Sequence, residues 1–244
     1  YADLCIGVSA GAANLVSYVS GQRGRNLNFY TKYNLSSRSI GALAWICSGG
    51  SFIDLDYIYG TLSKRNGKCP LDYEAFAASA QQFLAVSTDA DTGESVYFDK
   101  SCIHQDDYAV ISASSCFPGV CKPYRYNGRR YFDGYVSDPI PVQKALDCGC
   151  DRILVLLTSP KDRFLDDRND KYPATAERLA NYSKRYNQEL QLARDLEAEG
   201  RALILHPVKV RLSSLEKDKS KILALYHEGL EEGRRAAEFL RARP

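Results

Sequence analysis

The pentapeptide Gly7-Val8-Ser9-Ala10-Gly11 is the first place in the sequence where residue types and their spacing could support chemistry. It has the form G-x-S-x-G and stands between a short apolar run and an alanine-rich segment. A nucleophile elbow has this strand-turn-helix context and holds a serine hydroxyl beside a helix N-terminus. Gly7 and Gly11 would let strand and helix approach closely, and the backbone N–H of Ala10 would help to stabilise an oxyanion. We therefore predict a nucleophilic Ser9, against the alternative of a plain glycine turn.

A serine hydroxyl is a weak nucleophile at neutral pH, so Ser9 needs a base within hydrogen-bonding distance. Asp133 is one candidate, because the hairpin-like stretch YRYNGRRYF delivers it directly before Gly134. An ordinary Asp pKa of about 3.9 makes a weak base, so burial would have to raise the pKa of Asp133. The apolar walls that we expect around this carboxyl group are Tyr131, Phe132 and Tyr135.

The histidines are the other candidate bases, at positions 104, 206 and 227. The chain order Ser9, Asp133, His206 satisfies the triad order of an α/β-hydrolase. In that fold the oxyanion loop and the early strands come before the serine, whereas only eight residues precede Ser9 here. This triad stays open as an alternative to a Ser9–Asp133 dyad.

The charge balance and the apolar content of the chain argue against two broad classes of function. The 244 residues contain 32 Lys and Arg against 30 Asp and Glu, a formal net charge of +2. This composition lacks the basic footprint of a nucleic-acid-binding protein, so we expect no nucleic-acid partner. No apolar stretch approaches the roughly 20 residues that span a bilayer.

The eight cysteines show no metal-binding spacing. Cys-x-x-Cys does not occur, and Cys148-Gly149-Cys150 matches no zinc motif. A chain of this size can build a core without disulfides, so most of the thiols are expected to be reduced. We therefore predict no metal and no cofactor. The expected location is the cytoplasm, with peripheral contact to a membrane.

Apolar patterns alternate between strands and helices along the chain. Strands are predicted at residues 2–8, 82–87, 95–98, 153–158 and 202–208. Helices are predicted at residues 12–19, 70–80, 106–115, 143–147 and 175–199, whereas 38–51 is ambiguous. Asn127-Gly128 favours a type I′ hairpin turn, and the pair Ser213 and Glu216 has capping-box spacing before the last helix. The alternation predicts one α/β domain over residues 1–244.

Two motifs far apart in the sequence carry a further signal. GVSAG follows the first apolar strand, and SASSCFPGVCKPYRYNGRRYFDGYVSDPIPV comes far downstream. GQRGR after the first helix and RYNQEL in the long helix belong to the same pattern. Over nearly its whole length the chain resembles the patatin-like phospholipases, specifically the bacterial branch. The resemblance implies a three-layer α/β/α fold around a mostly parallel sheet.

The same resemblance implies a serine acyl hydrolase that cleaves carboxylic esters of lipids, or small esters, through an acyl-enzyme without metal or cofactor. By motif, Ser9 is the implied nucleophile and Asp133 the implied general base. Further motif and oxyanion residues are Ala10, Gly7, Gly11 and Gly134.

Two departures from the family pattern qualify this assignment. The family's glycine-rich oxyanion loop is expected upstream of Tyr1, and Tyr135 stands where the family usually has Gly or Ala. A module of the same fold that binds a lipid or a partner without catalysis is the alternative from another functional class.

Overall fold

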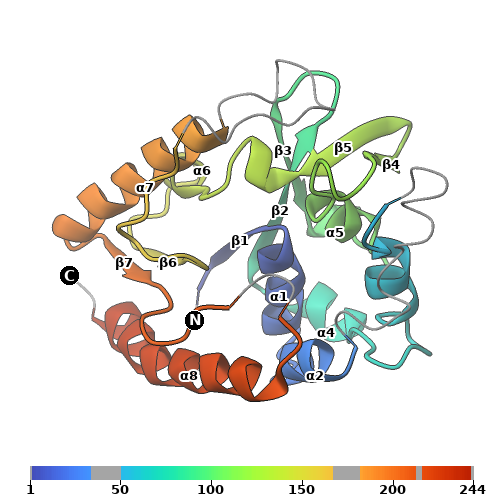
Figure 1. The fold of residues 1–244 in the computed structure, drawn as a ribbon, viewed down its shortest axis with the longest axis horizontal. Coiled ribbons are helices and arrows are strands. Elements are labelled where there is room, and N and C mark those ends of the chain that lie inside the picture. The colour runs from blue at the N-terminus through green and yellow to red at the C-terminus, as the bar shows by residue number, and fades with distance from the viewer. Residues whose placement is uncertain (1, 34–50, 167–181, 213–215, 243–244) are drawn as a thin grey trace. The chain divides into compact units, whose positions relative to one another are not determined.

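The computed structural model describes residues 2–33, 51–166, 182–212 and 216–242 (Figure 1). The chain divides into two compact units. The first unit comprises Asp3–Pro139 and Asp170–Tyr182, and the second comprises Tyr1–Ala2, Ile140–Asn169 and Ser183–Pro244. The two units are described one after the other. The prediction of a single domain over residues 1–244 stays a prediction.

A mixed five-stranded sheet forms the centre of the first unit, and β2 is the strand that pairs with three others (Figure 1). β1 (Leu4–Val8) pairs in parallel with β2 (Gln82–Asp89). β2 pairs in antiparallel with both β3 (Ser95–Asp99) and β5 (Arg129–Asp133). β4 (Tyr124–Tyr126) is antiparallel to β5. β1 and β5 pair with successive residues along the same edge of β2, because β3 pairs with the other edge.

The helices of the first unit follow the strands closely. α1 (Ala10–Val19) begins directly after β1, and α2 (Arg25–Lys32) follows it. Further along are η1 (Asp56–Thr61), α4 (Tyr73–Ala78), η2 (Lys100–Cys102), α5 (Ala109–Ser114) and η3 (Gly134–Val136). The Asp72 carboxylate accepts a hydrogen bond from the N–H of Ala75, which fixes the start of α4. Every helix predicted here is present; α4 and α5 are shorter than predicted, whereas α1 begins earlier than predicted, at Ala10.

The core of the first unit joins the face of β2 to α1, α4 and α5. Its most deeply buried side chains include Ala12, Phe76, Phe83, Val86, Val110 and Ile111. The rings of Phe76 and Phe83 meet edge to face, with centroids 5.5 Å apart. This packing ties α4 to the strand that lies next to β1.

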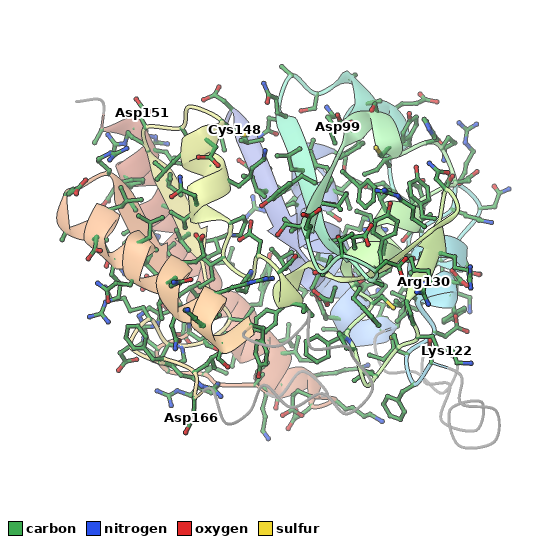
Figure 2. All side chains as sticks on the ribbon, turned by 90° about the horizontal axis from the view of Figure 1, so that it is seen from above. Asp99, Lys122, Arg130, Cys148, Asp151 and Asp166 are labelled. Carbon is green, nitrogen blue, oxygen red and sulfur yellow. The ribbon has the colours of Figure 1, made fainter. Side chains whose placement is uncertain are left out.

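The predicted β4–β5 hairpin is confirmed. Asn127 and Gly128 both have positive φ angles, 47° and 76°, as a type I′ turn requires. On the outer side of the hairpin, Arg130 forms an ion pair with Asp91 of the β2–β3 turn (Figure 2). The turn fixes the register of β5, and the register decides where Asp133 lies.

The second unit contains a parallel pair of strands. α6 (Val142–Asp147) precedes β6 (Ile153–Leu156), and β6 pairs with β7 (Ala202–Leu205). Between them runs α7 (Tyr182–Ala198), and α8 (Lys219–Arg241) follows β7. The buried stripe predicted for α7 is confirmed at Tyr186, Leu190, Ala193 and Leu196. Strands and helices alternate in both units, which confirms the α/β fold class.

The start of the last helix was predicted wrongly. α8 begins at Lys219, and its N-cap is Asp218, whose carboxylate accepts from the N–H of Ser220. Aspartate caps a helix as well as serine does. Glu216 instead accepts from the N–H groups of Lys217 and Asp218, in a turn before the helix. Ser213 lies outside the described residues, as do positions 38–50 of the ambiguous segment and 175–181 of the predicted long helix.

Two strand predictions were too long. β6 ends at Leu156 rather than at position 158, and β7 ends at Leu205 rather than at 208. Pro207, which has no N–H to donate to a ladder, follows closely after β7. Within the ranges that the structure describes, no helix combines the length and the apolar character needed to cross a bilayer.

Candidate functional site

Ser9 forms the turn between the end of β1 and the start of α1 (Figure 1). Its backbone has φ 55° and ψ −128°, a conformation that costs energy for any residue with a Cβ. The carbonyl oxygen of Ser9 accepts from the N–H groups of Ala12 and Ala13 and so begins α1. The N–H groups of Ala10 and Gly11 have no acceptor among the residues described. They are free to bind an anion at the helix N-terminus.

Ser114 holds this strained turn from another part of the chain. The N–H of Ser9 donates to Ser114 Oγ over 3.0 Å, and Ser114 Oγ donates to the carbonyl oxygen of Val86 over 2.6 Å. Ser114 is fully buried at the end of α5. One hydroxyl therefore links the turn to β2. Sequence analysis did not single out Ser114, although the SASS motif contains it.

The two motif glycines of the turn differ in their surroundings. A Cβ added at Gly7 would lie 2.5 Å from Ala12 Cα, so only glycine allows this approach of strand and helix. A Cβ at Gly11 would meet nothing within 4 Å among the described atoms, and its φ is not positive. The expected close approach at Gly11 was wrong, because the first turn of α1 leaves open space there.

Asp133 ends β5, beside the turn. In the sheet, Val8 pairs with Val86 and Asp133 pairs with Ser87. Because Val86 and Ser87 are adjacent on β2, the C-terminal ends of β1 and β5 lie next to each other. The N–H of Tyr135 donates to Asp133 Oδ1 over 2.9 Å. The Ser9 side chain lies close enough to the same carboxyl group to lower its pKa. The structure thus brings together the two residues that the sequence separates by more than half of the chain.

The backbone around Asp133 is fixed on several sides. Its N–H donates to the carbonyl oxygen of Cys116 over 2.9 Å, and its own carbonyl accepts from Thr88 Oγ1 over 2.8 Å. A Cβ added to Gly134 would lie 2.3 Å from the carbonyl oxygen of Val86, so no other residue fits there. These contacts leave the Asp133 carboxyl group little freedom to move.

Burial raises the pKa of Asp133 to about 7, and the hydrogen bonds from Ser9 and from the N–H of Tyr135 oppose that rise. The side chain is fully enclosed, with 2% of the residue exposed. An aspartate with such a pKa exchanges a proton near neutral pH, as a general base must.

The expected walls of Tyr131, Phe132 and Tyr135 need correction. Tyr131 packs edge to face on Phe98, with centroids 5.2 Å apart, and Phe132 packs with Val136. The Tyr135 ring lies 6.2 Å from that of Phe117 and 5.9 Å from that of Tyr182. Side chains alternate across a strand, so Phe132 points to the opposite face of β5 from Asp133, whereas Tyr131 shares the face of Asp133 and packs on Phe98.

The groups near Asp133 come instead from distant segments. Burial, then the charges of Tyr30 and Asp133, raise the pKa of Tyr59 on η1. A hydrogen bond with Cys121, then burial and the charges of Cys121 and Asp133, raise the pKa of Cys116. The Tyr59 hydroxyl also lies 3.3 Å from Ser115 Oγ. No local pattern in the sequence signals these neighbours, because each depends on long-range packing.

The comparison with known families identifies the fold that carries this site. The patatin-like phospholipase family matches residues 1–146, which include Ser9 and Asp133. This chain belongs to the patatin-like phospholipase family. Residues 172–242 match a second family, a domain of unknown function designated DUF6363.

Curated relatives show the same relationship. The patatin-like chain is 30% identical over 179 residues to the uncharacterized protein YjjU of Escherichia coli strain K12, covering 66% of this chain and 45% of that protein. It is 38% identical over 60 residues to an uncharacterized NTE family protein of Mycobacterium tuberculosis strain H37Rv and to one of Mycobacterium bovis. These matches cover 25% of this chain and 16% of each relative. The patatin-like chain thus spans less than half the length of these relatives.

The three histidines of the patatin-like chain, which the sequence offered as alternative bases, make contacts with other residues than Ser9 and Asp133. In the first unit, His104 pairs through its backbone with Asp107. His206 belongs to the second unit, where its ring Nδ1 lies 3.2 Å from the carbonyl oxygen of Pro207. His227 lies on α8 beside the ring of Tyr226. In the part of the chain that the structure covers, no group of three His, Cys, Asp or Glu could hold a metal ion, and seven cysteines are free.

Proposed function

We propose that this patatin-like protein is a serine acyl hydrolase that cleaves carboxylic esters of lipids through an acyl-enzyme. One observation carries the proposal. Ser9, on a strained turn at the N-terminus of α1, lies beside a buried aspartate, because Val8 and Asp133 pair with the adjacent residues Val86 and Ser87 of β2, and burial raises the pKa of that aspartate to about 7. A serine next to a base of this kind is the arrangement that activates a nucleophile.

In the acylation step, Ser9 Oγ attacks the ester carbonyl while its proton passes to Asp133. The N–H of Tyr135 occupies Oδ1, so Oδ2 is the oxygen available to accept the proton. The C–O bond of the ester then breaks, and the proton on Asp133 passes to the departing alkoxide. A buried Asp133 suits both transfers, because a pKa near neutrality lets it accept a proton and return it.

The negative charge on the carbonyl oxygen needs donors in place before the reaction. The N–H groups of Ala10 and Gly11 lie at the positive end of α1 and supply this stabilisation. In the second step, Asp133 takes a proton from water, which attacks the acyl carbonyl. The bond between the acyl group and Ser9 Oγ then breaks, the proton returns from Asp133 to Ser9 Oγ, and the acid is released.

The substrate class rests on the family rather than on the relatives, whose names give no substrate. We propose lipid esters as the natural substrates, small esters as usable surrogates, and peripheral contact with a membrane at the cytoplasmic face. Family membership favours the Ser9–Asp133 dyad over a triad with His206.

Fluorophosphonate labelling tests this function directly. We expect the intact protein to be labelled, and Ser9→Ala and Asp133→Asn each to abolish labelling. Asp138→Asn is the matched control, because Asp138 is also buried and accepts a hydrogen bond from the Tyr97 hydroxyl over 2.6 Å. His206→Ala is expected to label normally, whereas a triad would lose its base. A folded wild-type protein that resists labelling would favour a non-catalytic binding module.

A further inference from the structure

An open pocket of the first unit begins one helical turn beyond Ser9. It lies between α1, α2, η1 and α5, and Ala13, four residues after Ser9, lines its near end. Most of the lining is apolar or aromatic and comes from Val16, Phe29, Tyr59, Leu71 and Ile111. The Tyr59 hydroxyl lies 3.3 Å from Ser115 Oγ, and the neighbouring Ser114 holds the N–H of Ser9, so the pocket adjoins the proposed catalytic pair.

Arg25 lines the same pocket with a guanidinium group bound only by neutral acceptors. Nη1 donates to Ser17 Oγ over 2.9 Å, and Nη2 donates to Ser63 Oγ and to the carbonyl oxygen of Cys69, both over 2.8 Å. Nε donates to the carbonyl oxygen of Pro70 over 3.1 Å. This geometry turns Arg25 inward, not toward a lipid surface.

No carboxylate pairs with Arg25 in the described ranges, and burial lowers its pKa. A partly buried cation surrounded only by dipoles is costly, and an anion beside it would offset that cost. One N–H of Nη1 has no acceptor there. Tyr30, also lining the pocket, accepts from Asn14 Nδ2 over 3.4 Å, while its own hydroxyl proton has no acceptor among the described groups. Two residues that line the pocket therefore each keep one donor without an acceptor among the described groups.

The distance between Arg25 and the reacting atoms at Ser9 can be read along α1. Arg25 binds Ser17, which lies eight residues after Ser9 on α1, or about 12 Å along the axis at 1.5 Å per residue. A negative group held by Arg25 would thus lie about this far from the scissile carbonyl. The phosphate of a glycerophospholipid is separated from its ester carbonyls by only a few bonds, so this distance points to the acyl chain.

We propose that the pocket binds the acyl part of the ester and that Arg25 and Tyr30 bind a carboxylate at its far end. This inference rests on the proposed function and names its substrate class, esters whose acyl chain ends in a carboxylate. Two donors match the two oxygens of a carboxylate, whereas a phosphate brings three acceptor oxygens and up to two charges. The apolar wall between Ser9 and Arg25 contacts the methylene chain.

The first test compares paired substrates on the wild-type protein. p-Nitrophenyl half-esters of dicarboxylic acids, from succinic to dodecanedioic acid, are matched with p-nitrophenyl esters of monocarboxylic acids of equal length. We expect kcat/KM to favour the half-ester roughly 10- to 100-fold at one intermediate length, as a charge-assisted hydrogen bond predicts. A preference for the neutral ester at every length overturns the inference.

The second test separates ligand binding from a structural role of Arg25. Arg25→Met is expected to abolish the preference for the half-ester, because kcat/KM should fall much further on half-esters than on neutral esters of equal length. Tyr30→Phe should reduce the preference less, and Arg23→Met, which changes an exposed arginine two residues away, should leave it unchanged. An equal loss on charged and neutral esters would mean that Arg25 is only structural.

The outcomes also separate this inference from the function beneath it. Ser9-dependent hydrolysis of neutral esters without any preference for half-esters overturns the inference alone. Absence of both labelling and hydrolysis overturns the proposed function, and the inference fails with it. If Arg25→Met does not fold, the preference of the wild-type protein for half-esters, and the dependence of that preference on chain length, still test the inference.

Discussion

Asp133 at the end of β5 and Glu228 in the middle of α8 are both carboxylates with little exposed surface. Their surroundings shift their pKa values in opposite directions. Asp133 receives one backbone N–H, from Tyr135, and lies beside the side chain of Ser9, and burial raises its pKa to about 7. Glu228 receives three backbone N–H groups, and its pKa is lowered. The donors are Lys209, over 2.9 Å, Val208, over 2.6 Å, and Val210, over 2.9 Å.

The comparison shows that depth of burial and number of donors together decide whether a carboxylate can act as a base. Each backbone N–H that points at a carboxylate stabilises the charged form, and desolvation opposes it. Glu228 lies near the surface and has three such donors, so it is held as an anion that anchors the loop after β7 to α8. Asp133 lies much deeper and has fewer donors, so desolvation dominates and the group can carry a proton at neutral pH.

The largest expected difference between the two carboxylates is catalytic. Asp133→Asn should lower kcat on a p-nitrophenyl ester by about 10²- to 10⁴-fold, because the amide cannot take the proton of Ser9. Glu228→Gln should keep at least half of the wild-type kcat. Steady-state kinetics on both variants check this, and a substantial residual rate in Asp133→Asn would remove the aspartate from its proposed role.

The pH profile sharpens the same contrast. The base must be ionised, so log kcat/KM of the wild-type protein should rise by about one per pH unit below pH 7 and level off above it. Glu228→Gln should reproduce this profile. A rate that is flat from about pH 5 to pH 8 would show that no group with the pKa of Asp133 controls the reaction.

Stability should respond to the two carboxylates with opposite signs. The folded-state pKa of Asp133, about 7, lies above the unfolded value of about 3.9, so the folded state loses stability as pH rises between these values. Asp133→Asn should therefore raise Tm relative to wild type at pH 8, by an amount worth at most about 4 kcal/mol. Near pH 4 this gain should vanish. Thermal denaturation at both pH values measures it.

The smallest expected effect is the loss of stability when Glu228, which anchors the loop after β7 to α8, loses its charge. Its folded-state pKa is lowered, so its contribution is present above the unfolded pKa of about 4.3 and is lost as pH falls through the folded value. Glu228→Gln should lower the free energy of unfolding at pH 7 by roughly 1–3 kcal/mol. The difference from wild type should shrink in acid. An equal loss at pH 7 and pH 3 would show that charge is not what holds the loop.

The sequence predicted well those features that short segments determine. The β1 turn with Ser9, the Asn127-Gly128 hairpin and the placement of Asp133 all depend on neighbouring residues whose backbone preferences are strong. The sequence also allowed the prediction that Ser9 and Asp133 act together, because both residues belong to recognisable motifs.

Other features depend on tertiary packing and were missed. Gly7 and Gly11 look equivalent in the sequence, but only at Gly7 does the opposing chain come close. Ser114 and Tyr59 reach the site from other elements. Ser114 belongs to the SASS motif, but the sequence does not show which residue its hydroxyl contacts. The capping box predicted before α8 is not the cap that the helix uses, because the N-cap is Asp218.

The hydroxyl of Ser114 has a consequence for how the protein folds. It supplies the acceptor for the N–H of Ser9 from 105 positions away and is itself anchored on Val86. A nascent chain that has not yet reached α5 lacks this acceptor, so its turn is free to relax from the strained conformation. The turn that holds Ser9 therefore reaches its final conformation only after distant strands and helices have docked. We expect folding intermediates that lack these contacts to have an unreactive Ser9.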